Sequence, residues 1–358
     1  MLDIKITRTT CPKEKPQDES KLGFGKKFTD HMFVMDYTEG EGWHDARIVP
    51  YAPFPLDPAT VVFHYAQEIF EGMKLTALRM TPSSCSAPSA TQSVCRTLLT
   101  ACASPRSLLR ITSRPSRLWW MWTVTGCLTL TALPCISVPS CSQTMWSGRP
   151  RFQALHLLHH LRSVGRLLRR GHQPRAHLRR REYIRAAPGL TGFTKCGGNY
   201  AASIKAGELA EEQGYAQVLW LDGVEKKYVE EVGSMNIMFK IDGKVYTAAT
   251  VGTVLPGVTR RSCIELLKDW GYEVIEGKLA IADIMQAARD GKLEEVFGTG
   301  TAAVVSPVKE LVWKGEHAYI GDGSIGPVTQ KLYDTMTGMQ WGKIPDTKGW
   351  IVPVEKKY

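Results

Sequence analysis

A lysine set among small residues is the part of this sequence best suited to covalent chemistry. The run is Thr194-Lys195-Cys196-Gly197-Gly198-Asn199-Tyr200. Glycines let a backbone or a bulky ligand come close, and an amide and a phenol follow the lysine. A lysine amine that is partly withdrawn from water is neutral often enough to form an imine with an aldehyde. The run therefore predicts a Schiff-base lysine.

Three further features of the carboxyl-terminal half suit a phosphorylated pyridine. Glu230 and Glu231 lie in an expected strand and must face opposite ways, so we expect one in a site and the other in solvent. An inward carboxylate can hold a protonated ring nitrogen. Gly257-Val258-Thr259 opens an expected helix, whose free N–H groups favour a phosphate. Gly298-Thr299-Gly300-Thr301-Ala302 is a second small-residue turn with hydroxyls.

Hydrophobic patterns place these features on an α+β framework. Residues 32–37 and 47–49 are expected strands, and a helix over 61–70 sets Tyr65 and Ile69 on one face. Beyond residue 182 the patterns predict helices at 199–213, 259–270, 281–290 and 328–338, and strands at 217–221, 227–232, 235–239, 244–248, 272–276 and 295–299. Asp-Gly turns between consecutive strands predict a β-meander.

The segment 75–181 differs from the rest of the chain in composition. Its 107 residues include 16 Arg and six of the nine Cys, but no Lys, Asp, Glu, Asn or Tyr. The other 251 residues hold 29 basic and 35 acidic side chains, a formal charge of −6, whereas the whole chain carries +10. The basic charge therefore stems from one segment and does not by itself indicate a polyanionic partner.

The missing residue types share a genetic feature, since all their codons carry A at the second position. When a GC-rich gene is read one base out of frame, the former wobble base becomes the second base, and A is rare there. The products are residues such as Ser, Pro, Thr, Ala, Arg, Cys, Trp and Leu, which fill this segment. We therefore predict two compensating frameshifts, near Lys74 and near Arg181, either in the gene or in its sequencing.

Apparent motifs inside the segment carry little weight for the same reason. Residues 118–141 carry no charged side chain, as in a membrane span, but Pro134 and the lack of a second span argue against one. The cysteines show no zinc spacing, and no metal site is expected. Residues 149–181 could form a nucleic-acid patch, which leaves a basic nucleic-acid-binding protein as an alternative of a different class. Residues 1–21 lack the apolar core of a signal peptide, so a cytoplasmic location is expected.

Six motifs occur in an order that identifies a family. They are Phe28-Thr29-Asp30-His31-Met32, His64-Tyr65 with Phe70-Glu71-Gly72-Met73-Lys74, the run that starts at Lys195, Glu231-Val232-Gly233-Ser234-Met235-Asn236, Leu255-Pro256-Gly257-Val258-Thr259-Arg260 and Phe297-Gly298-Thr299-Gly300-Thr301-Ala302. Together they closely resemble the branched-chain amino-acid aminotransferases of the fold-type IV pyridoxal-phosphate class. The resemblance covers residues 20–74 and 182–358, about two thirds of the chain.

The resemblance implies cofactor contacts for the matching residues. Lys195 binds the aldehyde of pyridoxal 5′-phosphate and carries the proton between the substrate's Cα and the cofactor's C4′. Tyr200 hydrogen-bonds the phenolic oxygen, and Glu231 pairs with the ring nitrogen. Val258 and Thr259 bind the phosphate through their backbone N–H groups, and Thr301 assists them. Arg185 lies beside the cofactor.

Substrate contacts follow from the same resemblance, with two departures. Phe24 and Tyr65 line the apolar side-chain pocket, while Thr301 and Ala302 offer backbone N–H groups to the substrate carboxylate. A redox Cys-x-x-Cys of some animal members is replaced by residues that include Ala303 and Ser306, so no thiol switch is expected. The family's phosphate-binding arginine and Tyr-x-Arg substrate element fall in the segment 75–181, where no residue can be assigned to them.

The resemblance implies a two-domain fold, with a small domain at 1–181, disrupted over 75–181, and a lysine-bearing domain at 182–358. The implied activity is reversible amino transfer between leucine, isoleucine or valine and 2-oxoglutarate, in a homodimer. The chain as written is expected to be inactive or insoluble, because one wall of the pocket is missing. A D-amino-acid transaminase or an aminodeoxychorismate lyase, which share the fold and the lysine, remain alternatives within the class.

Overall fold

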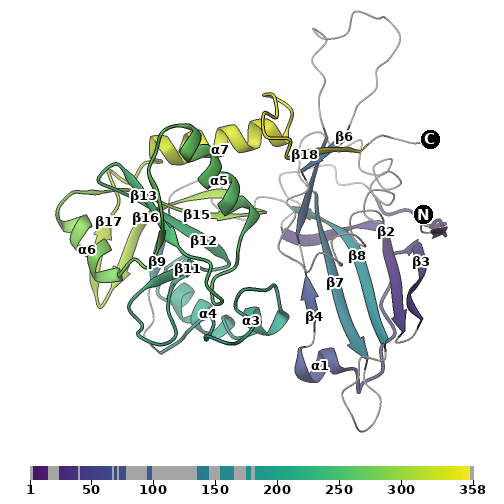
Figure 1. The fold of residues 1–358 in the computed structure, drawn as a ribbon. Helices are drawn as coiled ribbons and strands as arrows, with labels where there is room; N and C mark the ends of the chain where they lie inside the picture. Colours follow the sequence, from purple (N-terminus) through teal and green to yellow (C-terminus); the bar gives the residue numbers. More distant parts are fainter. Residues whose placement is uncertain are drawn as a thin grey trace, which may run out of the picture. The chain divides into compact units, whose positions relative to one another are not determined.

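The computed structural model (Figure 1) describes residues 3–14, 24–38, 41–66, 68–70, 72–77, 95–98, 135–144, 154–164, 175–178 and 182–354. By backbone proximity the chain forms two compact units, Met1–Leu167 with Thr337–Tyr358, and Leu168–Met336. The domain limit at 181/182 that the resemblance implies stays a prediction.

The first unit is built on one sheet. Its strands run in the order β1-β3-β2-β8-β7-β5-β6-β18, and β4 pairs with β7. Their bounds are β1 Lys5–Ile6, β2 Phe24–Thr38, β3 Gly42–Pro50, β4 Glu68–Phe70, β5 Met73–Ala77, β6 Cys95–Leu98, β7 Cys135–Thr144, β8 Ala154–Val164 and β18 Ile351–Val354. Residues 31–35 of β2 are buried without interruption, so both faces of the strand are covered there. The strands predicted at 32–37 and 47–49 are confirmed within β2 and β3.

The helix predicted over 61–70 is wrong beyond its first turn. Helix α1 spans only Val61–Tyr65, because Ala66 takes a left-handed conformation with φ 48° and ends it. The chain continues as β4, which pairs with β7. Tyr65 and Ile69 therefore do not share a helix face.

Among the described residues of the segment 75–181, four strands lie wholly within it, namely β6, β7, β8 and the second unit's β9 (Arg175–Leu178). β8 runs antiparallel to β2 and β7. The rest of the segment, including the predicted frameshift point near Arg181 and most of the arginine-rich stretch 149–181, lies outside the described residues. The structure thus gives a backbone path for parts of the segment and does not test the frameshift prediction.

The second unit contains a sheet that closes on itself. Strands follow the order β11-β10-β9-β16-β15-β12-β13-β14. β11 also pairs with β12, so the strands from β11 to β12 form a closed ring, and β13 and β14 extend it. The strand bounds are β10 Gln217–Leu221, β11 Val229–Val232, β12 Met235–Ile241, β13 Lys244–Ala248, β14 Val274–Gly277, β15 Leu293–Gly300, β16 Val304–Trp313 and β17 Glu316–Tyr319. β10 to β13 pair antiparallel in succession, which confirms the predicted meander.

Helices cover both faces of this sheet, as the period-two burial of β10 requires. Val218 and Trp220 of β10 pack with Ala206 and Ala210 of α4 (Ile204–Glu212). The intervening Leu219 and Leu221 belong to the core under α6 (Ile281–Arg289). Two more helices, α5 (Val258–Asp269) and α7 (Pro327–Gln340), agree with the predictions to within two residues at each end.

The helix predicted over 199–213 is divided into two. A short α3 spans Gly197–Ala201, and α4 begins at Ile204. Both the backbone N–H and the hydroxyl of Ser203 donate to the carbonyl of Tyr200, at 3.1 and 2.7 Å. A serine hydroxyl that competes for a backbone carbonyl in this way interrupts a helix.

Glu295 of β15 fixes the start of α7, which gives a stability prediction. Its buried carboxylate accepts hydrogen bonds from Val328 N at 3.0 Å, and from Thr329 N at 2.8 Å and Thr329 Oγ1 at 2.7 Å. Glu295→Gln places an amide donor against N–H or O–H donors, so we expect a loss of about 2 kcal/mol in the free energy of unfolding. Urea denaturation measures it.

The neighbouring Glu294 is the matched control. Its carboxylate is exposed and pairs with Lys240, so Glu294→Gln is expected to cost under about 1 kcal/mol. Equal effects of the two substitutions would contradict the proposed role of Glu295 at the start of α7.

Candidate active site

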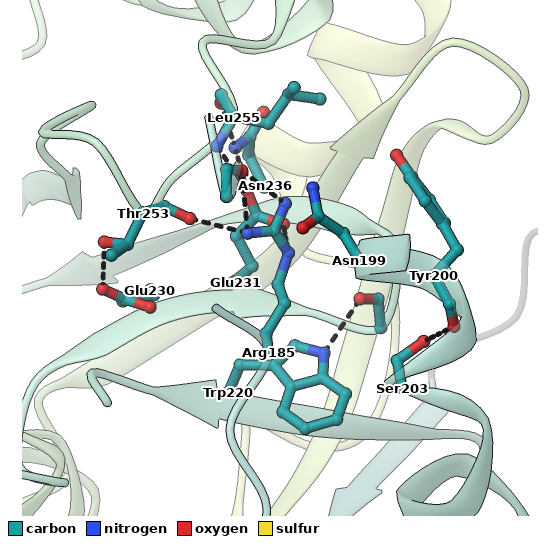
Figure 2. A network of polar contacts seen from close by, with 12 residues as sticks. Arg185, Asn199, Tyr200, Ser203, Trp220, Glu230, Glu231, Asn236, Thr253 and Leu255 are labelled. Carbon is teal, nitrogen blue, oxygen red and sulfur yellow. Dashed lines mark hydrogen bonds and ion pairs between the residues drawn. The ribbon is translucent and has the colours of Figure 1, made fainter. Parts of the chain in front are cut away.

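A row of buried polar side chains crosses the second unit's sheet. The register pairs Glu231 of β11 with Asn236 of β12, and Asn236 with Thr299 of β15. Side chains directly opposite in a ladder share a face. Glu231 also pairs with Trp220, whose side chain packs with α4, so the row faces that side. Figure 2 shows Glu231 and Asn236 of this row together with Trp220. We call Glu231, Asn236 and Thr299 the polar row; each is at most 5% exposed.

Glu231 is the acidic centre of the row. Its Oε2 lies 2.6 Å from Nε of Arg185, and its Oε1 accepts the backbone N–H of Leu255 at 2.7 Å and Nδ2 of Asn236 at 3.3 Å. Burial raises the pKa of this carboxyl to about 7, against the opposing effects of the Arg185 charge, the Leu255 hydrogen bond and the Lys195 charge. Lys195 therefore lies close enough to influence Glu231 electrostatically.

Arg185 is held so that one edge of its guanidinium faces this carboxylate. Nη1 donates to the carbonyl oxygens of Gly192 at 3.1 Å and Thr253 at 2.6 Å, and Nη2 donates to Gly192 at 3.1 Å. The side chain is buried and its nitrogens meet a carboxylate and two carbonyls (Figure 2). Arg185 thus contacts Glu231 directly, while a direct contact with a cofactor stays a prediction.

Glu230 corrects the expectation that one of the paired glutamates is solvated. It is 7% exposed, and its Oε1 accepts the hydroxyl of Thr253. Its Oε2 has no hydrogen-bond partner within the described residues. Burial raises the pKa of Glu230, against the Thr253 hydrogen bond and the Arg185 charge. The prediction that Glu230 and Glu231 face opposite sides of the strand holds. The loop that carries Thr253, however, covers the face of Glu230 as well.

The raised pKa of Glu231 predicts a pH-dependent stability of the cofactor-free protein. Between pH 4.5, the ordinary value, and about 7, the folded chain binds more protons at Glu231 than the unfolded chain. The contribution of Glu231 to the free energy of unfolding is therefore greatest below pH 4.5. It falls by about 3 kcal/mol as the pH rises to 7. We expect Glu231→Gln to remove this part of the decline, measured by urea unfolding at pH 5 and 7.5.

The exposed Glu208 supplies the control, because Glu208→Gln is expected to leave the decline unchanged. A decline of the same size in Glu231→Gln and in the parent chain would show that Glu231 does not titrate as the structure requires.

Lys195 stands between a tight turn and α3. Asn199, in the first turns of α3, ties that turn down: its Nδ2 donates to the carbonyls of Thr191 at 2.7 Å and Thr194 at 3.0 Å. Its Oδ1 accepts the hydroxyl of Thr191 at 2.8 Å. Lys195 itself is half-buried. The arrangement fixes the backbone on both sides of the lysine while leaving its side chain partly withdrawn from water, as an imine-forming amine requires.

Tyr200 lies on α3, five residues after Lys195, and is half-buried. Figure 2 shows its hydroxyl at the far end from Ser203, whose side chain is bonded to the Tyr200 backbone. Its predicted bond to a cofactor oxygen stays a prediction.

The start of α5 lies against the polar row. Asn236 Nδ2 donates to the carbonyl of Leu255 at 2.8 Å, and a Cβ added at Gly257 would lie 2.1 Å from Asn236 Oδ1. Only glycine allows this approach. Val258 and Thr259 are the first two residues of the helix, where backbone N–H groups have no partner within the helix itself. Thr259 is buried and Val258 half-buried. The geometry suits an anion at the helix start.

The predicted substrate residues lie in both units. Thr301 and Ala302 are half-buried in the turn between β15 and β16, within the second unit. Phe24 is the first residue of β2 in the first unit, and its side chain lies outside the described residues. Tyr65 is 67% exposed on α1 of the first unit. The structure therefore does not test whether these four residues share a pocket.

Comparisons with known proteins settle the family. A model described as amino-transferase class IV matches residues 169–311. Branched-chain-amino-acid aminotransferase 2 of Bacillus subtilis (strain 168) is 42% identical over 368 residues, covering 98% of this chain and 97% of its own. Branched-chain-amino-acid transaminase 1 of the same organism is 43% identical over 375 residues, covering 98% and 99%. The chain belongs to the family of branched-chain amino-acid aminotransferases.

Solved aminotransferases of this family share the fold. The branched-chain amino acid aminotransferase of Escherichia coli covers 90% of this chain and 99% of its own, with 22% identity and a TM-score of 0.67. The T.th. enzyme, solved with pyridoxamine 5′-phosphate, covers 90% and 98%, with 23% identity and a TM-score of 0.68. The α+β, fold-type IV prediction is confirmed.

Two residues of this aminotransferase site were missed from the sequence. Asn236 appears in the sequence only as part of a motif, and Thr299 only as one hydroxyl of a turn expected to bind phosphate, with no individual role for either. The alternation of β12 and β15 places each on a definite face, but their pairing with Glu231 depends on strand register. A signal was present in the spacing of Glu231 and Asn236, five residues apart around a Gly233 turn, as in a tight hairpin.

Within the described residues, no cluster of three or more His, Cys, Asp or Glu side chains could hold a metal ion. Among the described helices of this aminotransferase, none combines the length and apolar character needed to cross a bilayer.

Proposed function

We propose that this aminotransferase moves an amino group reversibly between leucine, isoleucine or valine and 2-oxoglutarate, using pyridoxal 5′-phosphate. The observation that carries the proposal is the polar row, which brings a buried carboxylate, the start of α5 and the influence of Lys195 into one region of the second unit. Relatives named for this activity, aligned over almost the whole chain, support the substrate class over a D-amino-acid transaminase or a lyase.

The residues present fit pyridoxal 5′-phosphate. Glu231 offers a buried carboxylate for a protonated ring nitrogen, and the start of α5 offers backbone N–H groups for a phosphate. Lys195 supplies the amine that would bind the cofactor covalently, and Tyr200 follows it on α3. When bound, the cofactor supplies an electron sink that lets the substrate's Cα lose its proton.

Each protein group has a separate task in this proposal. Lys195 Nζ holds the cofactor covalently and, once displaced by the substrate amine, moves the proton between Cα and C4′. Glu231 keeps the proton on the ring nitrogen, and the Arg185 charge 2.6 Å away favours the ionised carboxylate that this requires. Thr253 and Gly192 hold Arg185 in place through their carbonyls.

In this proposal, the start of α5 and the turn after β15 bind the phosphate and the substrate carboxylate. Val258 and Thr259 bind the phosphate through N–H groups at the start of α5, with Thr301 assisting. Thr301 and Ala302 offer N–H groups to the substrate carboxylate. Phe24 and Tyr65 are the proposed contacts of the aliphatic side chain. We further propose a cytoplasmic homodimer.

We also propose that residues 75–181 are read out of frame. The segment lacks five residue types entirely, while the aligned relatives cover nearly all of both chains. The segment thus stands in place of a family segment of similar length, as two compensating frameshifts require. The family's phosphate-binding arginine and Tyr-x-Arg element belong to the replaced part, so the chain as written lacks these groups.

Two measurements test the proposed function. Sequencing of the gene between codons 74 and 181 is expected to show the two shifts, and an in-frame gene encoding the present residues would refute them. The protein from the restored frame is expected to show the visible absorption of a lysine-bound cofactor and leucine-dependent formation of glutamate from 2-oxoglutarate. Activity with D-alanine and none with leucine would contradict the substrate assignment.

A further inference from the structure

One buried hydroxyl of the polar row, on Thr299, lacks a hydrogen bond within the described part of the chain. Thr299 is 1% exposed, and its Oγ1 finds no hydrogen-bond partner within the described residues. Buried hydroxyls in folded proteins are nearly always hydrogen-bonded, since an unpaired one loses its bonds to water without replacement. An exception of this kind points to a group that is absent from the cofactor-free chain.

The direction of this hydroxyl is fixed by the strand on both sides. Gly298 and Gly300 face the opposite way, where a Cβ at Gly298 would lie 2.9 Å from Cε of Met235 and one at Gly300 3.3 Å from its Cγ. Thr299 therefore shares its face with Asn236, its partner across the ladder. That is the face of the polar row.

Asn236 connects this position to the start of α5. Its Nδ2 bonds the carbonyl of Leu255, and its Oδ1 lies so close to Gly257 that only a glycine fits. Opposite side chains in a ladder lie about 5 Å apart, so the Thr299 hydroxyl is one side chain away from the helix start. Thr301, two residues further along, lies in the turn that follows β15.

Phosphate is the chemistry that matches this place. A hydroxyl can donate to an anion, the free N–H groups at the start of the 12-residue α5 do the same, and their dipole favours negative charge. The other row members are already engaged, Glu231 by Arg185 and Asn236 by Leu255. We propose that Thr299 is a further cofactor-binding residue, whose hydroxyl hydrogen-bonds the phosphate group; this inference rests on the proposed function.

The test compares two ligands that differ only in the phosphate. Binding of pyridoxal 5′-phosphate and of pyridoxal to the cofactor-free, full-length protein with restored frame is followed by intrinsic fluorescence. Thr299→Val is expected to weaken pyridoxal 5′-phosphate binding about tenfold, as for one hydrogen bond to a charged group, and pyridoxal binding less than twofold. Thr299→Ser, which keeps the hydroxyl, is expected to bind both like the parent.

A buried threonine with a satisfied hydroxyl is the matched control. Thr247 of β13 is 2% exposed and donates to the carbonyl of Ile237 at 2.8 Å, so Thr247→Val is expected to leave the ratio of the two affinities unchanged. If Thr299→Val does not fold, Thr299→Ala carries the same comparison.

The outcomes separate the two proposals. A parent protein that does not bind pyridoxal 5′-phosphate refutes the proposed function. A parent that binds it, with Thr299→Val weakening both ligands equally or neither, overturns the role of Thr299 and leaves the proposed function intact. Protection of the cofactor-free protein against thermal unfolding by inorganic phosphate is a second readout, expected in the parent and reduced in Thr299→Val.

Discussion

Lys195→Ala is expected to abolish the visible absorption of the lysine-bound cofactor and to lower leucine-dependent glutamate formation by about a thousandfold or more. The substitution removes both the covalent attachment and the group that moves the proton between Cα and C4′, and positioned proton transfer alone contributes roughly 10²–10⁴-fold. Absorption spectra and initial rates of the protein with restored frame measure the two effects.

The control for Lys195 is a lysine ten residues away. Lys205, on α4, is exposed and its amine lies 3.8 Å from Glu208. We expect Lys205→Ala to retain the absorption and the rate of the parent. A Lys195→Ala protein with activity within tenfold of the parent would place the covalent chemistry elsewhere.

Restoring the reading frame over residues 75–181 is expected to raise soluble activity by at least about a hundredfold over the chain as written. The replaced segment holds the family's phosphate-binding arginine and substrate element, and even a 1 Å misplacement of reacting groups can cost 10²-fold. Both proteins, expressed from the same vector, are compared by soluble yield and by transamination rate per mole of protein.

Solubility and activity together show how the lost residues act. If the restored chain is soluble and active and the written chain is soluble but inactive, the lost residues act in catalysis. If the written chain is insoluble, they act first in folding. Equal activity of the two chains would contradict the out-of-frame proposal.

Local signals predicted much of the second unit. The strands β10 and β13 have the limits expected from period-two alternation, because Asp222-Gly223 and Asp242-Gly243 mark the turns beside them. The Asp222 carboxylate accepts the N–H groups of Glu225, Lys227 and Tyr228, so this turn organises itself within the local sequence.

Features that depend on distant partners were not predicted. The strand β4 forms where a helix was expected, because its backbone pairs with β7, whose partner residues lie 70 to 74 positions further along the chain. β16 was missed altogether; Pro307 interrupts its apolar run and normally argues against a central strand, yet β16 lies between β15 and β9. Local sequence carries no signal for such pairings.

The same distinction holds within the site. Lys195, Glu231 and the start of α5 are recognisable from motifs and spacing. The burial of Glu230 depends on Thr253, 23 residues away, and the opposition of Asn236 and Thr299 joins strands more than 60 residues apart. Burial likewise raises the pKa of Glu231, whose partners Arg185 and Leu255 lie in other segments of the chain.

The most direct measurement of the account is the chemical trapping of the cofactor. The protein with restored frame is incubated with pyridoxal 5′-phosphate, reduced with borohydride, digested and mapped by mass spectrometry. We expect one stoichiometric phosphopyridoxyl adduct, on the peptide that contains Lys195, and its prevention by prior addition of leucine, which displaces the lysine. An adduct distributed over surface lysines such as Lys205, or its absence from Lys195, would contradict the central claim.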